Sequence, residues 1–144
     1  MKNGKRGALL GGVTVLLCCA VFFSGCGGGS YRDGTYAGRS GEDDTGAWGE
    51  VSVVISGGRI SGCSFVTRQK DGTVKGEDYG KIHGEISNRS HYDKAQLAVR
   101  AMEQYAADLA RTGNIGELEA VSGATIAWDQ FNEAVMKALS AAKK

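Results

Sequence analysis

Alternating apolar residues followed by a glycine turn most strongly restrict what this chain can fold into. Val51, Val53 and Ile55 alternate with polar or less buried positions, as in a strand with one buried face. Ser56-Gly57-Gly58 then supplies a tight turn, and residues 59–67 continue as a second strand. The sequence therefore predicts a β-hairpin.

A first amphipathic helix is predicted after the hairpin. Ser90, followed three residues later by Asp93, has the pattern of a helix start. Gly113 suits the left-handed C-cap at which many helices end. Between these signals, apolar residues at helical spacing form a core-facing stripe: Ala95, Ala98, Met102, Tyr105 and Leu109.

A second amphipathic helix is predicted near the C-terminus. Glu133 and Lys137 lie four residues apart, in the orientation that favours an ion pair. Residues 31–39 are glycine-rich and are expected to contribute a short extended segment. Strands first and helices afterwards predict an α+β fold, a small antiparallel sheet with two main helices packed on it. The apolar stripe of the second helix comprises Trp128, Phe131, Val135, Ala138, Leu139 and Ala142.

The segment Ser122-Gly123-Ala124-Thr125 lies where the second helix is predicted to begin. Ser122 is a good N-cap, and with that cap Val121 and Ile126 take the two positions of a hydrophobic staple. The start of a helix has unpaired N–H donors and the positive end of the helix dipole, which suit an anion. Thr125 adds a hydroxyl that could hold or esterify a phosphate. On these four residues alone, an ordinary capped helix is the favoured interpretation.

Residues 70–84 are polar and interrupted by glycines, which predicts a long loop. Loops of this length in a compact domain often line binding sites. His83 and His91 are the only histidines. Neither is paired with a Ser or Cys nucleophile, so both are expected on the surface and no catalytic residue is predicted. Glu42-Asp43-Asp44 is expected to be a solvated loop, because no calcium-ligand spacing accompanies it.

Residues 1–25 have the layout of a secretory signal peptide, with a positively charged start. The apolar run over residues 8–23 is short of the ~20 residues that span a bilayer. Ser24-Gly25-Cys26 resembles the lipobox of bacterial lipoproteins, which implies cleavage before Cys26 and lipid attachment to its sulfur. Residues 26–30 would then be the lipidated cysteine and a flexible Gly/Ser tether. Plain secretion with an unmodified Cys26 is the alternative.

Cysteine use and charge exclude several classes of protein. Cys18 and Cys19 lie in the leader, so lipidation of Cys26 leaves Cys63 as a single buried thiol without a disulfide partner. No Cys–His spacing predicts a metal site. The chain carries 17 basic and 16 acidic residues, and this near-neutral balance gives no reason to expect nucleic acid as a partner. Residues 31–144 have a length that suits a single domain.

Residues 31–144 resemble the FMN-binding domain family. That family includes the flavin-carrying subunits of sodium-translocating NADH:quinone reductase and of the Rnf complex, and small extracytoplasmic lipoproteins. Its flavinylation motif is an acidic residue, two variable positions, Ser or Thr, and then Gly-Ala-Thr. The segments that carry the resemblance are residues 31–36, 57–60, 76–80 and 119–125, followed by Phe131.

The resemblance implies an attachment site for FMN. Thr125 would receive FMN through a phosphoester, transferred from FAD by a separate magnesium-dependent flavin transferase. Ser122, Gly123 and Ala124 complete the motif, and Glu119 occupies the acidic position where Asp is usual. FMN is therefore the expected cofactor.

The isoalloxazine ring of FMN needs an apolar and aromatic surface. Trp128, Tyr79 and Tyr36 are candidates, each with core packing as the alternative. The function implied is that of an extracytoplasmic electron carrier, anchored by lipid to the bacterial cell membrane. Redox partner proteins or a quinone-linked membrane complex would be its partners. Two alternatives stay open: a flavin-dependent reductase with its own small-molecule acceptor, and a flavin-free surface lipoprotein that acts as a protein-binding module.

Overall fold

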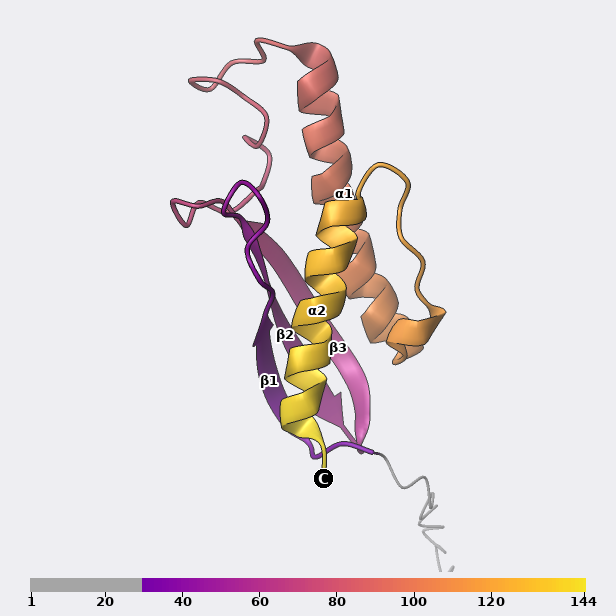
Figure 1. Cartoon of the computed structure of the whole chain (residues 1–144). Helices are drawn as coiled ribbons and strands as arrows, with labels where there is room; N and C mark the ends of the chain where they lie inside the picture. The colour runs from indigo at the N-terminus through magenta and orange to yellow at the C-terminus, as the bar shows by residue number, and fades with distance from the viewer. Residues whose placement is uncertain (1–29) are drawn as a thin grey trace, which may run out of the picture.

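A computed structural model describes residues 30–144 of the chain. Three strands, β1 (Gly34–Arg39), β2 (Trp48–Ser56) and β3 (Arg59–Arg68), form an antiparallel sheet in the order β1-β2-β3. The helices α1 (Arg89–Thr112) and α2 (Thr125–Ala142) cover one face of this sheet (Figure 1). A short 3-10 turn, η1 (Ile115–Glu117), follows α1. The predicted α+β fold is confirmed, whereas the predicted signal peptide, Cys26 and most of the tether lie outside the described residues.

The predicted hairpin forms with its turn at the glycine pair. Ser56 pairs with Arg59, so Gly57 and Gly58 make a two-residue turn. Both have positive φ, 61° and 73°, as the turn type that matches the twist of a hairpin requires. Along β2, Val51, Val53 and Ile55 are buried, and they form the sheet side of the core.

The helices complete the core with their apolar stripes. Phe131, Val135 and Ala138 of α2 are fully buried. The predicted ion pair between Glu133 and Lys137 is present, at 2.7 Å. Gly38 lets β1 approach α2 closely, because a Cβ added to this glycine would lie 1.9 Å from the Ala134 carbonyl oxygen.

The first helix begins two residues before the position predicted for it. Asn88, and not Ser90, is the N-cap, and its side chain accepts a hydrogen bond from the His91 N–H at 3.0 Å. At the other end the predicted cap is confirmed, because Gly113 has φ 68° and donates its N–H to the Leu109 carbonyl. Neither this helix nor another in residues 30–144 is both long and apolar enough to cross a membrane.

The predicted long loop is ordered against α1. No named helix or strand lies between β3 and α1. The Gln96 side chain donates hydrogen bonds to the carbonyls of Gly76, Glu77 and Tyr79, at 2.9 to 3.3 Å. Tyr79 is thereby held at a defined place beside the helices. His83 and His91 are exposed, as predicted.

Candidate functional site

A pocket of about 390 Å³ opens beside the start of α2. This volume falls within the range of small-molecule sites, roughly 300–1,000 Å³. Four parts of the chain line it: the loop between β1 and β2, the end of β3 with the following loop, α1, and the start of α2. The lining residues are Asp43, Thr45, Thr67, Lys75, Tyr79, Ala98, Met102, Gly123, Ala124, Thr125, Ile126, Ala127 and Gln130.

Asp43 anchors one wall of the pocket. Its carboxylate accepts hydrogen bonds from the N–H and hydroxyl of Thr45 at 2.8 and 2.6 Å, and from the Ala47 N–H at 3.0 Å. Gln130, itself buried, donates to the same carboxylate at 3.3 Å. Burial by itself would raise the pKa of Asp43, but the bonds from Thr45 and Ala47 outweigh it and the pKa lies below its ordinary value. The expectation of a simply solvated acidic loop is therefore wrong for Asp43.

Lys75 places a positive charge in the pocket wall. Its side chain is 11% exposed, and its Nζ lies 4.0 Å from an Asp43 carboxylate oxygen. The same Nζ lies 4.9 Å from the centre of the Tyr79 ring, within cation–π range. Neither the long contact with Asp43 nor the aromatic face is a close hydrogen bond. The ammonium is therefore well suited to donate to an anionic or carbonyl oxygen of a ligand.

The helix α2 begins at Thr125, so the prediction of Ser122 as its N-cap is wrong. The N-cap position is Ala124, and no side chain caps this helix end. Ser122 is exposed in a turn closed by a bond from the Ala124 N–H to the Val121 carbonyl. The predicted staple is absent as well, because Ile126 is 61% exposed. The uncapped end leaves the first N–H groups of α2 available to an anion, beside the exposed Thr125.

Gly123 explains why the helix starts later than predicted. Its φ of 84° is left-handed, so the chain is still turning there and helical geometry begins two residues further on. A Cβ at this position would also come within 3.0 Å of Leu97 Cδ2. Glycine is thus required at this point of the turn. The turn is tied to α1 because Val121 donates its N–H to the Tyr105 hydroxyl at 2.8 Å.

The structure brings together some of the predicted site residues and separates others. Tyr79 shares the pocket with Gly123, Ala124 and Thr125. Trp128 lies outside the pocket lining and packs against Tyr105 and Phe131, with ring centres 5.1 and 6.1 Å away. Glu119 and Ser122 are exposed and outside the lining.

Tyr36 lies far from the pocket. Tyr36 belongs to β1. Gly38 of the same strand lies against Ala134 and Ala138 in the second half of α2. At 1.5 Å per helical residue, that level is more than ~14 Å along α2 from Thr125.

Sequence reasoning missed the polar wall formed by Asp43, Lys75 and Gln130. One signal was present: Gln130 is a polar residue on the buried side of an otherwise apolar helix. Within residues 30–144, no cluster of three or more His, Cys, Asp or Glu side chains could hold a metal ion.

Comparisons with known proteins identify the family. The model of the FMN-binding domain matches residues 46–140. The fold is similar to a crystal structure of a Clostridium perfringens protein, with a TM-score of 0.60 and 19% identity over 78% of this chain and 88% of that one. A solution structure from Clostridium thermocellum matches with a TM-score of 0.46 and 23% identity, over 78% of this chain and 93% of that one. No curated protein matches the sequence.

The residues of the pocket fit FMN. The uncapped start of α2 suits a phosphate, because unpaired N–H groups and the helix dipole both favour an anion there. The Lys75 ammonium and the Tyr79 ring line the same pocket, where they suit the polar edge and the face of a flavin. The match covers well over half of the chain, so this protein belongs to the FMN-binding domain family, with FMN as its cofactor.

Proposed function

We propose that this protein is an extracytoplasmic electron carrier, anchored to the cell membrane by lipid on Cys26, that holds FMN covalently on Thr125. The observation that carries the proposal is the position of Thr125. Its exposed side chain stands at the first residue of an uncapped helix and at the edge of the pocket. An acceptor hydroxyl needs this combination of access and neighbouring N–H donors.

The covalent step is a phosphoryl transfer. The Thr125 oxygen forms a bond to the phosphorus that carries riboflavin, the pyrophosphate bond of FAD breaks, AMP leaves, and the hydroxyl proton is lost. A separate magnesium-dependent transferase that uses FAD would catalyse this step. Gly123, which lacks a side chain, and the small Ala124 leave room for such an enzyme next to the hydroxyl.

Covalent attachment would keep FMN on the protein where noncovalent binding is too weak. A helix N-terminus stabilises an anion by roughly 0.3–1 kcal/mol, more when it is partly buried. That alone is too little to keep a cofactor against dilution outside the cell. The ester therefore holds the cofactor, while the pocket orients it.

The pocket residues would set the working properties of the bound flavin. FMN supplies the redox chemistry when it is bound, and the protein supplies position and electrostatic tuning. Lys75 places a cation in the wall, and its Nζ lies 4.0 Å from a carboxylate oxygen of Asp43. Gln130 fixes Asp43 by its hydrogen bond and donates another to the Ala47 carbonyl at 3.0 Å.

One hollow elsewhere on the domain lies too far from Thr125 to hold an acceptor for the flavin. A separate hollow of about 450 Å³ lies on the strands, lined by residues such as Ala37, Ser52 and Ser64. Ser52 and Ser64 face away from the helices, because their neighbours Val51, Val53 and Phe65 point into the core. A molecule held there would be separated from Thr125 by the sheet.

Intact mass spectrometry tests the proposal, on protein co-expressed with a flavin transferase. We expect the mass of one FMN ester, which Thr125→Ala abolishes and Thr125→Ser retains. Ser140→Ala is the matched control, because this hydroxyl is exposed on the same helix but lies outside the motif and the pocket lining, and it should keep the adduct. Colourless wild-type protein without an adduct would refute covalent attachment. Membrane fractionation of Cys26→Ser tests the anchor separately, since this variant should be released.

A further inference from the structure

The chain enters the domain at the end opposite to the FMN pocket. Tyr31 forms a β-bridge with Lys143, and Arg32 donates its N–H to the Ala142 carbonyl at 2.8 Å. The first described residues are thereby held at the last turn of α2 (Figure 1). Thr125 is the first of the 18 residues of this helix. At 1.5 Å per residue, the attachment point of FMN lies about 27 Å from the entry point of the chain.

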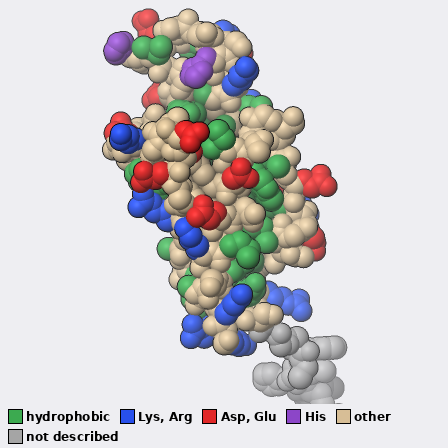
Figure 2. All heavy atoms as spheres, in the orientation of Figure 1, with side chains coloured by type: hydrophobic (Ala, Val, Ile, Leu, Met, Phe, Trp, Pro, Cys, Tyr) green, Lys and Arg blue, Asp and Glu red, His purple; other side chains and the backbone are tan. Residues whose placement is uncertain are grey.

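Positive charge gathers at this entry end. Arg32, Arg59, Lys143 and Lys144 are all exposed there. On the face drawn in Figure 2, the Lys and Arg side chains at this end are not accompanied by Asp or Glu side chains, whereas farther along the molecule the two kinds are mixed. The turn between β2 and β3 belongs to the same end, because Asp33 accepts hydrogen bonds from the N–H groups of Gly57 and Gly58 at 3.0 and 2.7 Å. We call Arg32, Arg59, Lys143 and Lys144 the basic end.

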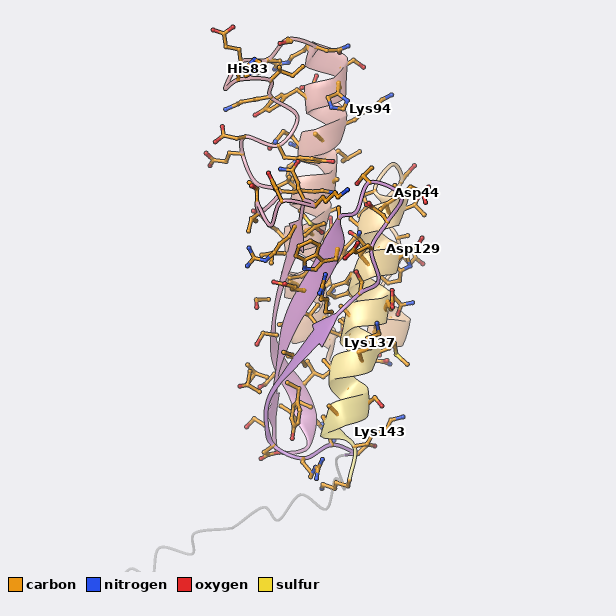
Figure 3. The ribbon with its side chains drawn as sticks, turned by 60° about the vertical axis from the view of Figure 1, so that its left-hand side comes forward. Asp44, His83, Lys94, Asp129, Lys137 and Lys143 are labelled. Atoms are coloured by element: carbon orange, nitrogen blue, oxygen red, sulfur yellow. The ribbon has the colours of Figure 1, made fainter. Side chains whose placement is uncertain are left out.

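The pocket half of the molecule exposes acidic side chains as well as basic ones such as Lys94. Figure 3 shows Asp44 and Asp129 in the half of the domain where α2 begins, with Lys143 at the other end. Both aspartates are exposed. An anionic surface would therefore attract the basic end more strongly than the pocket half, where acidic side chains offset the basic ones.

We infer that the basic end docks on anionic phospholipid headgroups and holds the FMN pocket away from the bilayer. The inference rests on the proposed lipid anchor at Cys26. The tether between Cys26 and Tyr31 reaches at most about 17 Å when extended. It keeps the basic end close to the membrane, but by itself it would let the domain lie on its side.

Attraction between the basic end and anionic headgroups would hold the domain upright on the membrane. Each basic side chain near an anionic membrane favours the contact by roughly fivefold. Four such residues, reduced by the charges of Asp33 and of the carboxylate of Lys144, give a preference of about 25-fold for the upright arrangement. The electron partner must then reach a pocket standing about 27 Å above the basic end. A protein that projects from the membrane fits this requirement, whereas a quinone dissolved in the bilayer does not.

Energy transfer from the native tryptophans measures this orientation. Trp48 and Trp128 both lie toward the pocket end, at the start of β2 and near the start of α2. The chain from Cys26 onward, with Cys63→Ser, is coupled through its Cys26 thiol to a maleimide lipid. Vesicles of phosphatidylcholine, with or without phosphatidylglycerol, carry a dansyl lipid as the acceptor. We expect severalfold lower transfer in the anionic vesicles, and a rise to the phosphatidylcholine level at high salt.

Charge reversal supplies the matched comparison. Arg59→Glu, Lys143→Glu and Lys144→Glu together should remove the difference between the two kinds of vesicle. Lys70→Glu, Lys94→Glu and Arg100→Glu change the net charge equally at exposed positions outside the basic end and should leave it unchanged. Far-UV circular dichroism verifies that the variants fold.

Two outcomes would overturn the inference: equal transfer in both vesicles for the unreversed protein, or equal effects of the two triple variants. The salt titration needs no charge variant, so a misfolded variant does not prevent the test. Chemical coupling makes the result independent of whether a host attaches lipid to Cys26. The intact mass of the host-matured full chain reports on that attachment alone.

Discussion

The hydroxyl of Tyr105 connects the core to the turn that presents Thr125, and its removal is the sharpest test of how the site is built. Tyr105 is 1% exposed, and its hydroxyl accepts the Val121 N–H at 2.8 Å. Its ring stacks on Phe131, with centres 5.5 Å apart, and meets Trp128 edge-on. Tyr105→Phe keeps these ring contacts and removes only the oxygen.

The expected cost follows from the burial of the N–H that loses its partner. A buried donor left unpaired costs roughly 1–3 kcal/mol. Val121 is only half-buried, so water can partly replace the hydroxyl. We expect the free energy of unfolding to fall by about 1 kcal/mol, which corresponds to a decrease in Tm of roughly 4 °C for a domain of this size. Tyr105→Leu, which also removes the ring, should cost about 3 kcal/mol or more.

Urea unfolding and amide exchange together check this prediction. The midpoint should shift with an unchanged slope, and the Val121 amide should exchange about fivefold faster. Tyr92→Phe is the matched control, because its hydroxyl donates to the Glu77 carbonyl at an exposed site, and it should cost less than about 0.5 kcal/mol. Unchanged stability and unchanged Val121 exchange in Tyr105→Phe would refute the idea that this hydroxyl holds the turn.

Three further predictions address packing, redox tuning and pH. Gly38→Ala should destabilise the domain by about 3 kcal/mol or more, because the new Cβ would meet the Ala134 carbonyl at 1.9 Å; Gly76→Ala, with open space around it, should be nearly neutral in the same urea unfolding experiment. Lys75→Met should lower the midpoint potential of bound FMN, because reduction adds negative charge that the ammonium stabilises. The expected decrease is roughly 20 mV for each kcal/mol of this stabilisation, for a two-electron couple. A redox titration that finds an unchanged potential would show that Lys75 does not act on the flavin. The pKa of Asp43 lies below its ordinary value of 3.8, so its ionised form contributes stability that is complete above that value and lost as the pH falls through the lower, folded-state pKa. When the pH is lowered from about 6 to about 2, the urea midpoint of Asp43→Asn should therefore fall less steeply than that of the unchanged protein.

Cys63 gives a useful contrast to these functional groups. Burial raises the pKa of its thiol to about 11, so the thiol stays protonated and unreactive at neutral pH. This agrees with the structural role expected for it, although the residue is half-buried and not fully buried.

Local patterns were enough for much of the fold. The hairpin turn at Gly57-Gly58 and the end of α1 at Gly113 depend on residues within a few positions of each other. Periodicity likewise indicated the buried stripes of both helices. The start of α2 was harder, because Ser122 has the chemistry of a cap but not its position. Whether it caps depends on the backbone at Gly123, and a left-handed residue there delays the helix.

The pocket shows where sequence reasoning ended. Tyr79 and Thr125 could be named as candidates because they lie in recognisable motifs. The polar wall of the pocket could not be predicted, since Asp43 and Gln130 are 87 residues apart and their contact is non-local. Asp43 looks like part of a solvated acidic run until the fold places Thr45, Lys75 and Gln130 around it.

The sequence by itself determined most of the elements and the family motif, because these follow from short-range periodicity and residue chemistry. Tertiary structure alone decided which charges share a surface. It joined Asp43, Lys75 and Gln130 into one wall, and it set the entry of the chain and the basic end about 27 Å from Thr125, the length of α2. The physical reason is that electrostatic and packing energies depend on distance in space, which a linear pattern does not contain.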